Sequence, residues 1–127
     1  MSTVKYYDWS FHQARTRPNK VAVKEVSSGR ETTYGQLEER SCRLASWLQN
    51  KGVKKGDRVA ILIHNCTEVF ELEFACAKIG AIELPLNWRL TKPELEYILN
   101  DSSPEVLIYG SNFVDIAESL LKDCSIK

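Results

Sequence analysis

Three polar residues follow long apolar runs, and they are the residues of this sequence best placed to meet a substrate. His64 comes directly after RVAILI (residues 58–63), and Asn87 and Arg89 come after AIELPL (residues 81–86). Ligands of parallel α/β sheets gather beyond the carboxyl ends of the strands. There, His64 could serve as a general base or a hydrogen-bond donor. Asn87 and Arg89 could face the substrate cleft of a larger enzyme.

Each of these residues also has a structural interpretation, which the sequence favours. His64 can be an ordinary polar residue of a strand–helix loop, next to the capping residue Asn65. Asn87 can cap its own loop, and Arg89 can pair with a carboxylate elsewhere. No carboxylate or nucleophile is placed by the sequence to work with His64. The three residues are therefore candidates for substrate binding, and no catalytic set emerges.

The motifs of the common α/β enzymes are missing from the sequence. There is no G-x-x-x-x-G-K-[ST] phosphate loop, and the turn HNCTE (residues 64–68) lacks the glycines of a dinucleotide-binding fingerprint. No G-x-S-x-G nucleophile elbow occurs. The four cysteines include no C-x-x-C pair, which argues against a zinc cluster or a thioredoxin-type site. No metal site or bound cofactor is therefore expected within this chain.

Composition and charge exclude further classes of function. The formal net charge of the 127 residues is zero, so there is no electrostatic case for nucleic acid. The first residues, MSTVKYYDWS, lack the apolar run of a signal peptide, and no apolar stretch is long enough to be a transmembrane segment. Widely spaced cysteines fit a reducing compartment better than a disulfide framework. We expect a cytoplasmic protein.

Strands and helices alternate along the sequence after an N-terminal hairpin. A capping box, Thr33 to Gln36, opens a helix that Gly52 ends, and a second helix begins at residues 65–68 and closes at Gly80. The remaining expected elements are a helix over 8–17, a hairpin over 21–34, strands over 58–63, 81–86 and 105–109, and helices from Thr91 and from Phe113.

This order predicts an α/β fold: a three-layer α/β/α arrangement with a small parallel sheet of about three strands, plus the N-terminal β-hairpin. Three strands make a narrow sheet for this architecture. An edge left bare in this way invites a partner or more chain. The sequence therefore predicts an incomplete part of a larger domain, with possible self-association through exposed apolar surface.

Taken together, the segments over roughly residues 10 to 110 resemble the opening of the adenylate-forming acyl-CoA synthetases, the AMP-binding enzyme superfamily. The nearest type is the bacterial medium- and long-chain fatty acyl-CoA ligases. No single mark is specific, but their order and spacing make the resemblance strong. The marks are Ala14, Pro18, Ala22, Thr33-Tyr34, Leu37, Gly52, Gly56-Asp57-Arg58-Val59, Asn65, Lys78-Ile79-Gly80-Ala81, Pro85-Leu86-Asn87, Leu95, Ile98 and Asp101-Ser102.

The resemblance implies a two-step enzyme. ATP and a carboxylic acid would form an acyl-adenylate, coenzyme A would capture the acyl group as a thioester, and Mg²⁺ would hold the triphosphate. The family's phosphate loop, its nucleotide-binding motifs and the lysine of its mobile C-terminal domain lie outside this sequence. Residues 1–127 would thus be the N-terminal portion of the family's large N-terminal domain. No catalytic residue is carried over, and the fragment alone is expected to be inactive.

Two alternatives remain open. The chain could be a stand-alone, non-catalytic α/β binding or regulatory module. It could also belong to a ligase for another acid, such as an aryl or small-acid CoA ligase or a peptide-synthetase adenylation unit, because the acid pocket lies beyond this sequence.

Overall fold

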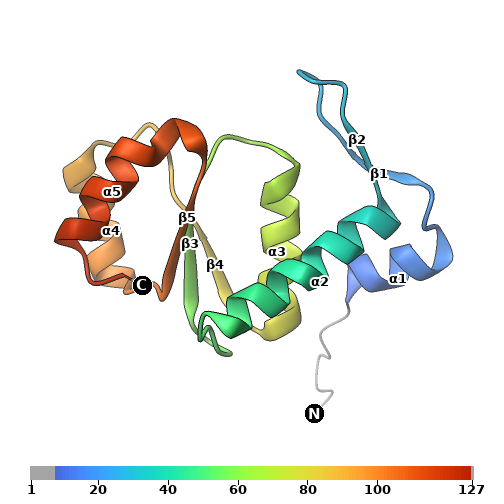
Figure 1. The fold of residues 1–127 in the computed structure, drawn as a ribbon, viewed down its shortest axis with the longest axis horizontal. Helices are drawn as coiled ribbons and strands as arrows, with labels where there is room; N and C mark the ends of the chain where they lie inside the picture. The colour runs from blue at the N-terminus through green and yellow to red at the C-terminus, as the bar shows by residue number, and fades with distance from the viewer. Residues whose placement is uncertain (1–7, 127) are drawn as a thin grey trace, which may run out of the picture.

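The computed structural model describes residues 8–126 and confirms the predicted α/β fold (Figure 1). A helix and a hairpin precede a three-stranded parallel sheet with helices on both of its faces. The order is α1 (Trp9–Thr16), β1 (Val21–Lys24), β2 (Glu31–Thr33), α2 (Tyr34–Asn50), β3 (Arg58–Leu62), α3 (Thr67–Ile79), β4 (Ile82–Pro85), α4 (Lys92–Ser102), β5 (Val106–Tyr109), the 3₁₀ turn η1 (Ser111–Phe113) and α5 (Val114–Asp123).

The sheet has the strand order β4-β3-β5, and both pairings are parallel. Val59 lies opposite Glu83 of β4 and opposite Val106 of β5. The central strand β3 is almost wholly apolar, and Val59 to Leu62 are at most 2% exposed. A strand covered on both faces needs such an unbroken apolar run.

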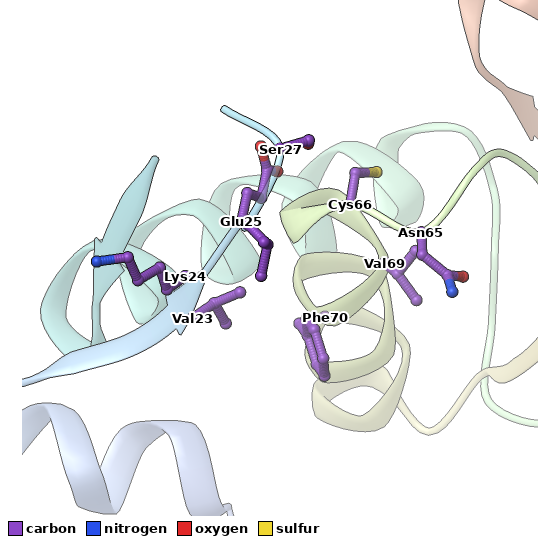
Figure 2. A pocket seen from close by; sticks show the side chains of 9 residues that line it. Val23, Lys24, Glu25, Ser27, Asn65, Cys66, Val69 and Phe70 are labelled. Carbon is purple, nitrogen blue, oxygen red and sulfur yellow. The ribbon is translucent and has the colours of Figure 1, made fainter. Parts of the chain in front are cut away.

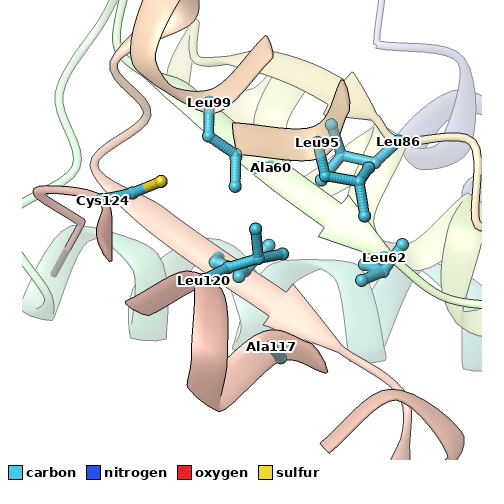
Figure 3. Packing of buried hydrophobic residues seen from close by; sticks show 9 residues of the cluster. Ala60, Leu62, Leu86, Leu95, Leu99, Ala117, Leu120 and Cys124 are labelled. Carbon is cyan, nitrogen blue, oxygen red and sulfur yellow. The ribbon is translucent and has the colours of Figure 1, made fainter. Parts of the chain in front are cut away.

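Alternate residues of β3 enter two separate cores. Val59 packs with residues of α2 and α3 on one face of the sheet. Ala60 and Leu62 pack on the other face, where Leu95 and Leu99 of α4 and Ala117 and Leu120 of α5 lie over the strands (Figure 3). Because both faces of the narrow sheet are apolar, helices cover both: α2 and α3 on one face, α4 and α5 on the other. None of the helices within residues 8–126 has both the length and the apolar character needed to cross a membrane.

Most predicted helix ends are confirmed. The Thr33 hydroxyl accepts the Gln36 N–H at 3.3 Å, and the Gln36 side chain accepts the Thr33 N–H at 2.9 Å. Gly80 ends α3 with a left-handed φ of 71°, which glycine adopts at least cost. The helix predicted from Thr91 is α4, which runs to Ser102 and stops where Ser103 turns left-handed.

The predicted cap at the start of α3 is wrong. Cys66, rather than Asn65, is the N-cap residue, and the Cys66 side chain makes no capping hydrogen bond. Instead Glu25, from the hairpin, accepts hydrogen bonds from the Thr67 backbone N–H and from the Thr67 hydroxyl, both at 2.9 Å. The helix start is therefore satisfied by a distant carboxylate.

Candidate functional site

The loops that leave the three strands meet at the carboxyl edge of the sheet, and the candidate residues lie there. The His64 ring contacts the Trp88 ring edge-on, with centroids 4.7 Å apart, and the Phe113 ring at 4.8 Å. Trp88 is flanked on another side by Arg89, whose guanidinium carbon is 4.2 Å from the centre of the Trp88 ring. His64 and Arg89 therefore belong to one cluster, which is joined through Trp88.

Local hydrogen bonds give the β4–α4 loop its shape. The Leu86 N–H donates to the Ile61 carbonyl at 2.9 Å, which keeps the loop in register with the sheet. The Asn87 side-chain oxygen then accepts the Arg89 N–H at 3.1 Å, and its carbonyl accepts the Leu90 N–H at 3.0 Å. The loop-capping interpretation of Asn87 is thereby confirmed, since its acceptor oxygen is used within its own turn.

The other structural interpretation, an ion pair for Arg89, is wrong for residues 8–126. No carboxylate of this part of the chain lies within ion-pair distance of Arg89, and the side chain is exposed. A guanidinium over the face of an aromatic ring is held by a cation–π contact, which uses none of its N–H groups as hydrogen-bond donors to a carboxylate. Arg89 is thus an oriented cation that can bind an anionic group of a ligand.

Two shallow hollows flank the β3–α3 loop at this edge. One, of about 340 Å³, lies between His64 and the β5–α5 loop. The other, of about 320 Å³, lies between Asn65 and the β4–α4 loop and is lined by Asn87 and Arg89. Both volumes lie at the low end of the roughly 300–1,000 Å³ of small-molecule pockets, and both hollows are open to solvent rather than enclosing a ligand. The edge can therefore supply part of a binding cleft.

A larger hollow, of about 560 Å³, lies between the hairpin and the first turns of α3. Figure 2 shows Val23 of the hairpin on one wall and Val69 and Phe70 of α3 on the other, with Glu25 beside them. Glu25 is held by the Thr67 N–H, by the Ser28 and Thr67 hydroxyls and by Arg30, and these donors lower the pKa of its carboxyl to about 2.

The groups that could hold a nucleotide or a metal ion are limited. Within residues 8–126 no three His, Cys, Asp or Glu side chains come together as a metal site. The N-terminus of α3, which in many α/β proteins receives a phosphate, already receives the Glu25 carboxylate. The α3 N-terminus is therefore occupied by a carboxylate, and we assign the described residues no step of ATP or Mg²⁺ chemistry.

Sequence reasoning placed His64, Asn87 and Arg89 at the correct edge but missed the aromatic side chains that join them. The sequence marks Phe113 only as the start of a helix, and nothing in it singles out Trp88 as a contact of His64. A signal was available, because Phe113 follows the last strand as His64 follows the first, so both side chains reach the same edge. Glu25 had no local signal at all.

Comparisons with known proteins agree with this architecture. A family model described as AMP-binding enzyme matches residues 10–126. A fatty acid–[acyl-carrier-protein] ligase of Streptomyces coeruleorubidus is 40% identical over 111 residues, which cover 87% of this chain and 21% of that protein. A feruloyl-CoA synthase of an Amycolatopsis species is 40% identical over 112 residues, which cover 88% and 22%.

Among solved structures, a Mycobacterium tuberculosis fatty acyl CoA synthetase superposes with a TM-score of 0.84 at 33% identity. The match covers 94% of this chain and 25% of that one. The chain thus spans only about a fifth of the length of the curated relatives it matches.

Proposed function

The chain belongs to the AMP-binding enzyme family, and from this premise we propose that residues 1–127 form the N-terminal portion of the large N-terminal domain of an acyl-CoA ligase. The ligase joins ATP and a carboxylic acid into an acyl-adenylate with release of pyrophosphate. Coenzyme A then displaces AMP and leaves an acyl-CoA thioester. The observation that carries the proposal is the match along residues 10–126, which coincides with the described three-layer fold.

The proposed acid is a medium- or long-chain fatty acid. Support comes from the relatives whose names include fatty acid or fatty acyl substrates. The similarly close feruloyl-CoA synthase keeps an aryl acid as the second candidate. The place of action that we propose is the cytoplasm.

At the site, we propose that Arg89, Asn87 and His64 border the substrate cleft of the ligase. Arg89 would bind an anionic group, because its guanidinium is stacked on Trp88 and has no carboxylate partner within residues 8–126. Asn87 would set the loop, since its side-chain oxygen fixes the Arg89 backbone. His64 would hold Trp88 through its edge-on ring contact. ATP, coenzyme A and Mg²⁺ would meet their main ligands outside these residues.

The experiment is fatty-acid-dependent ATP–pyrophosphate exchange, measured for the full-length protein and for residues 1–127. We expect exchange with the full-length protein and none with the fragment. A panel of fatty, aryl and short acids, read by exchange and by thermal stabilisation in the presence of ATP, identifies the acid. Exchange by the fragment alone would overturn its proposed inactivity. No exchange by the full-length protein with any acid would favour a non-catalytic binding module.

A further inference from the structure

The edge strand β4 offers its backbone to a further strand. The Ile82 N–H donates to the Asp57 carbonyl at 2.7 Å, and the Leu86 N–H donates to the Ile61 carbonyl at 2.9 Å. Because alternate residues of a strand direct their backbone groups to opposite neighbours, the N–H and carbonyl of Glu83 point away from β3. No strand of residues 8–126 lies on that side. Pro85 has no N–H, so pairing at this edge centres on Glu83.

The side chain of Glu83 is the unusual feature of this edge. Glu83 lies opposite Val59, which packs against α2 and α3, so the Glu83 side chain is on the α3 face. Its Oε1 atom is buried and has no hydrogen-bond partner among the described residues. Burial, and secondly the negative charge of Glu73 on α3, raise the pKa of the Glu83 carboxyl to about 7. A buried carboxylate needs a hydrogen-bond donor, and the described residues do not supply one to Glu83.

An apolar side chain also lies exposed on the edge strand itself. Ile82 is 51% exposed on β4, next to Glu83 in the chain. An exposed apolar group beside a buried carboxylate without a donor fits a surface that is covered in an assembled state. A partner that carries a cation and apolar residues would complement both features.

We propose that the open edge of β4 receives an extended peptide segment that carries a lysine or arginine opposite Glu83. On the same face of paired strands, opposite residues have Cβ atoms about 5 Å apart, within reach of a salt bridge. The incoming cation hydrogen-bonds the buried Oε1 atom and is attracted by Glu73 as well. Alternate apolar residues of the segment cover Ile82.

A second copy of this chain is a poor occupant of this edge. Two β4 edges related by a two-fold axis bring the two Glu83 side chains together, and like charges on facing strands repel. Glu83 could also act in the opposite way, as an inward-pointing charge that keeps other strands off the edge. The test separates these roles.

The test pans a phage-displayed library of random peptides of about twelve residues, long enough for one strand, against three forms of the chain. These are the wild type, Glu83→Gln, and Glu118→Gln, an exposed carboxylate on α5 as a matched control. We expect enriched peptides with alternating apolar residues and a central Lys or Arg. Their affinity should fall about tenfold for Glu83→Gln, as for loss of one charged hydrogen bond, and stay unchanged for Glu118→Gln.

Carbon-13 NMR of the Glu83 carboxyl gives the second readout. Binding of an enriched peptide should lower the pKa of this carboxyl from about 7 to below its ordinary value of 4.5. Hydrogen exchange of the Glu83 amide should slow at the same time. Peptides that lack a cation, equal binding to Glu83→Gln, or no enrichment overturn the proposal. So does a Glu83→Val variant that dimerises where the wild type does not, because Glu83 would then be a blocking charge. None of these readouts depends on ligase activity.

Discussion

Two glutamates lie beside α3, and their surroundings are opposite. Glu25, at the N-terminus of the helix, accepts hydrogen bonds from the Thr67 N–H and hydroxyl and from Ser28, and its pKa falls to about 2. Glu83, beside the later turns, has a buried oxygen without a donor among residues 8–126, and its pKa rises to about 7. The same side chain is stabilised as an anion at one place and destabilised at the other.

The comparison between Glu25 and Glu83 shows which carboxylates receive their donors from the described residues. A carboxylate at a helix N-terminus with several donors is a structural group, and it fixes the hairpin to α3. A buried carboxylate without donors costs free energy, and for Glu83 we have proposed that a segment outside the described residues supplies the donor. The hairpin side of α3 is therefore finished, whereas the β4 side is open.

The largest effect is expected from turning satisfied carboxylates into unpaired ones. Lys78 is only 11% exposed, and its ammonium lies 2.7 Å from Asp8 and 2.8 Å from Glu38. Lys78→Met keeps the length of the side chain but leaves two partly buried carboxylates without their cation. We expect the free energy of unfolding, measured by urea denaturation, to fall by about 3 kcal/mol. The control Lys92→Met, which breaks an exposed pair with Asp123, should change it little.

The second prediction concerns the hairpin contact itself. Glu25→Gln removes the negative charge at the α3 N-terminus, so hydrogen exchange of the β1 and β2 amides should become faster by about tenfold. The folded pKa of about 2 lies below the ordinary value of 4.5. The stabilisation by Glu25 is thus complete above pH 4.5 and is lost as the pH falls toward 2.

A pH series of urea denaturation checks this sign. The stability difference between wild type and Glu25→Gln should shrink across that acid window. The control Glu31→Gln removes a carboxylate from the same hairpin; among the described residues its one ion pair is with the exposed Lys24. Equal effects of the two variants on exchange would contradict a special role for Glu25.

The contrast between the two glutamates also marks the limit of what the sequence predicts. Local patterns suffice for the capping box at Thr33, for the left-handed end at Gly80 and for the three-layer order, because each depends on neighbours within a few residues. Glu25 and Thr67 are 42 residues apart. No short-range pattern connects them, and the predicted cap at Asn65 was therefore wrong.

In the candidate site, too, local patterns could be predicted from the sequence and long-range contacts could not. Parallel strands bring their carboxyl ends to one edge, so His64 and Asn87 could be placed there from the alternation of strands and helices alone. The ring contacts among His64, Trp88 and Phe113 join three separate loops. Their packing depends on loop geometry that a one-dimensional pattern does not contain.

The third prediction is a gain in stability. Glu83→Gln keeps the side-chain volume and removes the unpaired charge, so at pH 8 the free energy of unfolding should rise by about 1 kcal/mol, after allowing for solvent screening of a half-buried group. The folded pKa of about 7 exceeds the ordinary 4.5, so wild-type stability should fall as the pH rises through that window and level off above it. Urea denaturation of both proteins across the window tests this. A parallel pH dependence for the variant would contradict the assignment to Glu83.

The smallest effect on stability is expected at Arg89, and that is what makes the experiment informative. Arg30 bonds Glu68 through two nitrogens at 2.9 Å and also reaches Glu25, whereas the Arg89 side chain has only the Trp88 ring as a partner within residues 8–126. Arg89→Gln should therefore change the free energy of unfolding by less than about 0.5 kcal/mol, and Arg30→Gln should change it more. In the proposed full-length ligase, Arg89→Gln should raise KM for one substrate by about tenfold, the loss of one charged contact. If Arg89→Gln instead destabilises the fold as much as Arg30→Gln and leaves every KM unchanged, Arg89 is a structural cation, and the carboxyl edge is as complete within this chain as the hairpin side of α3.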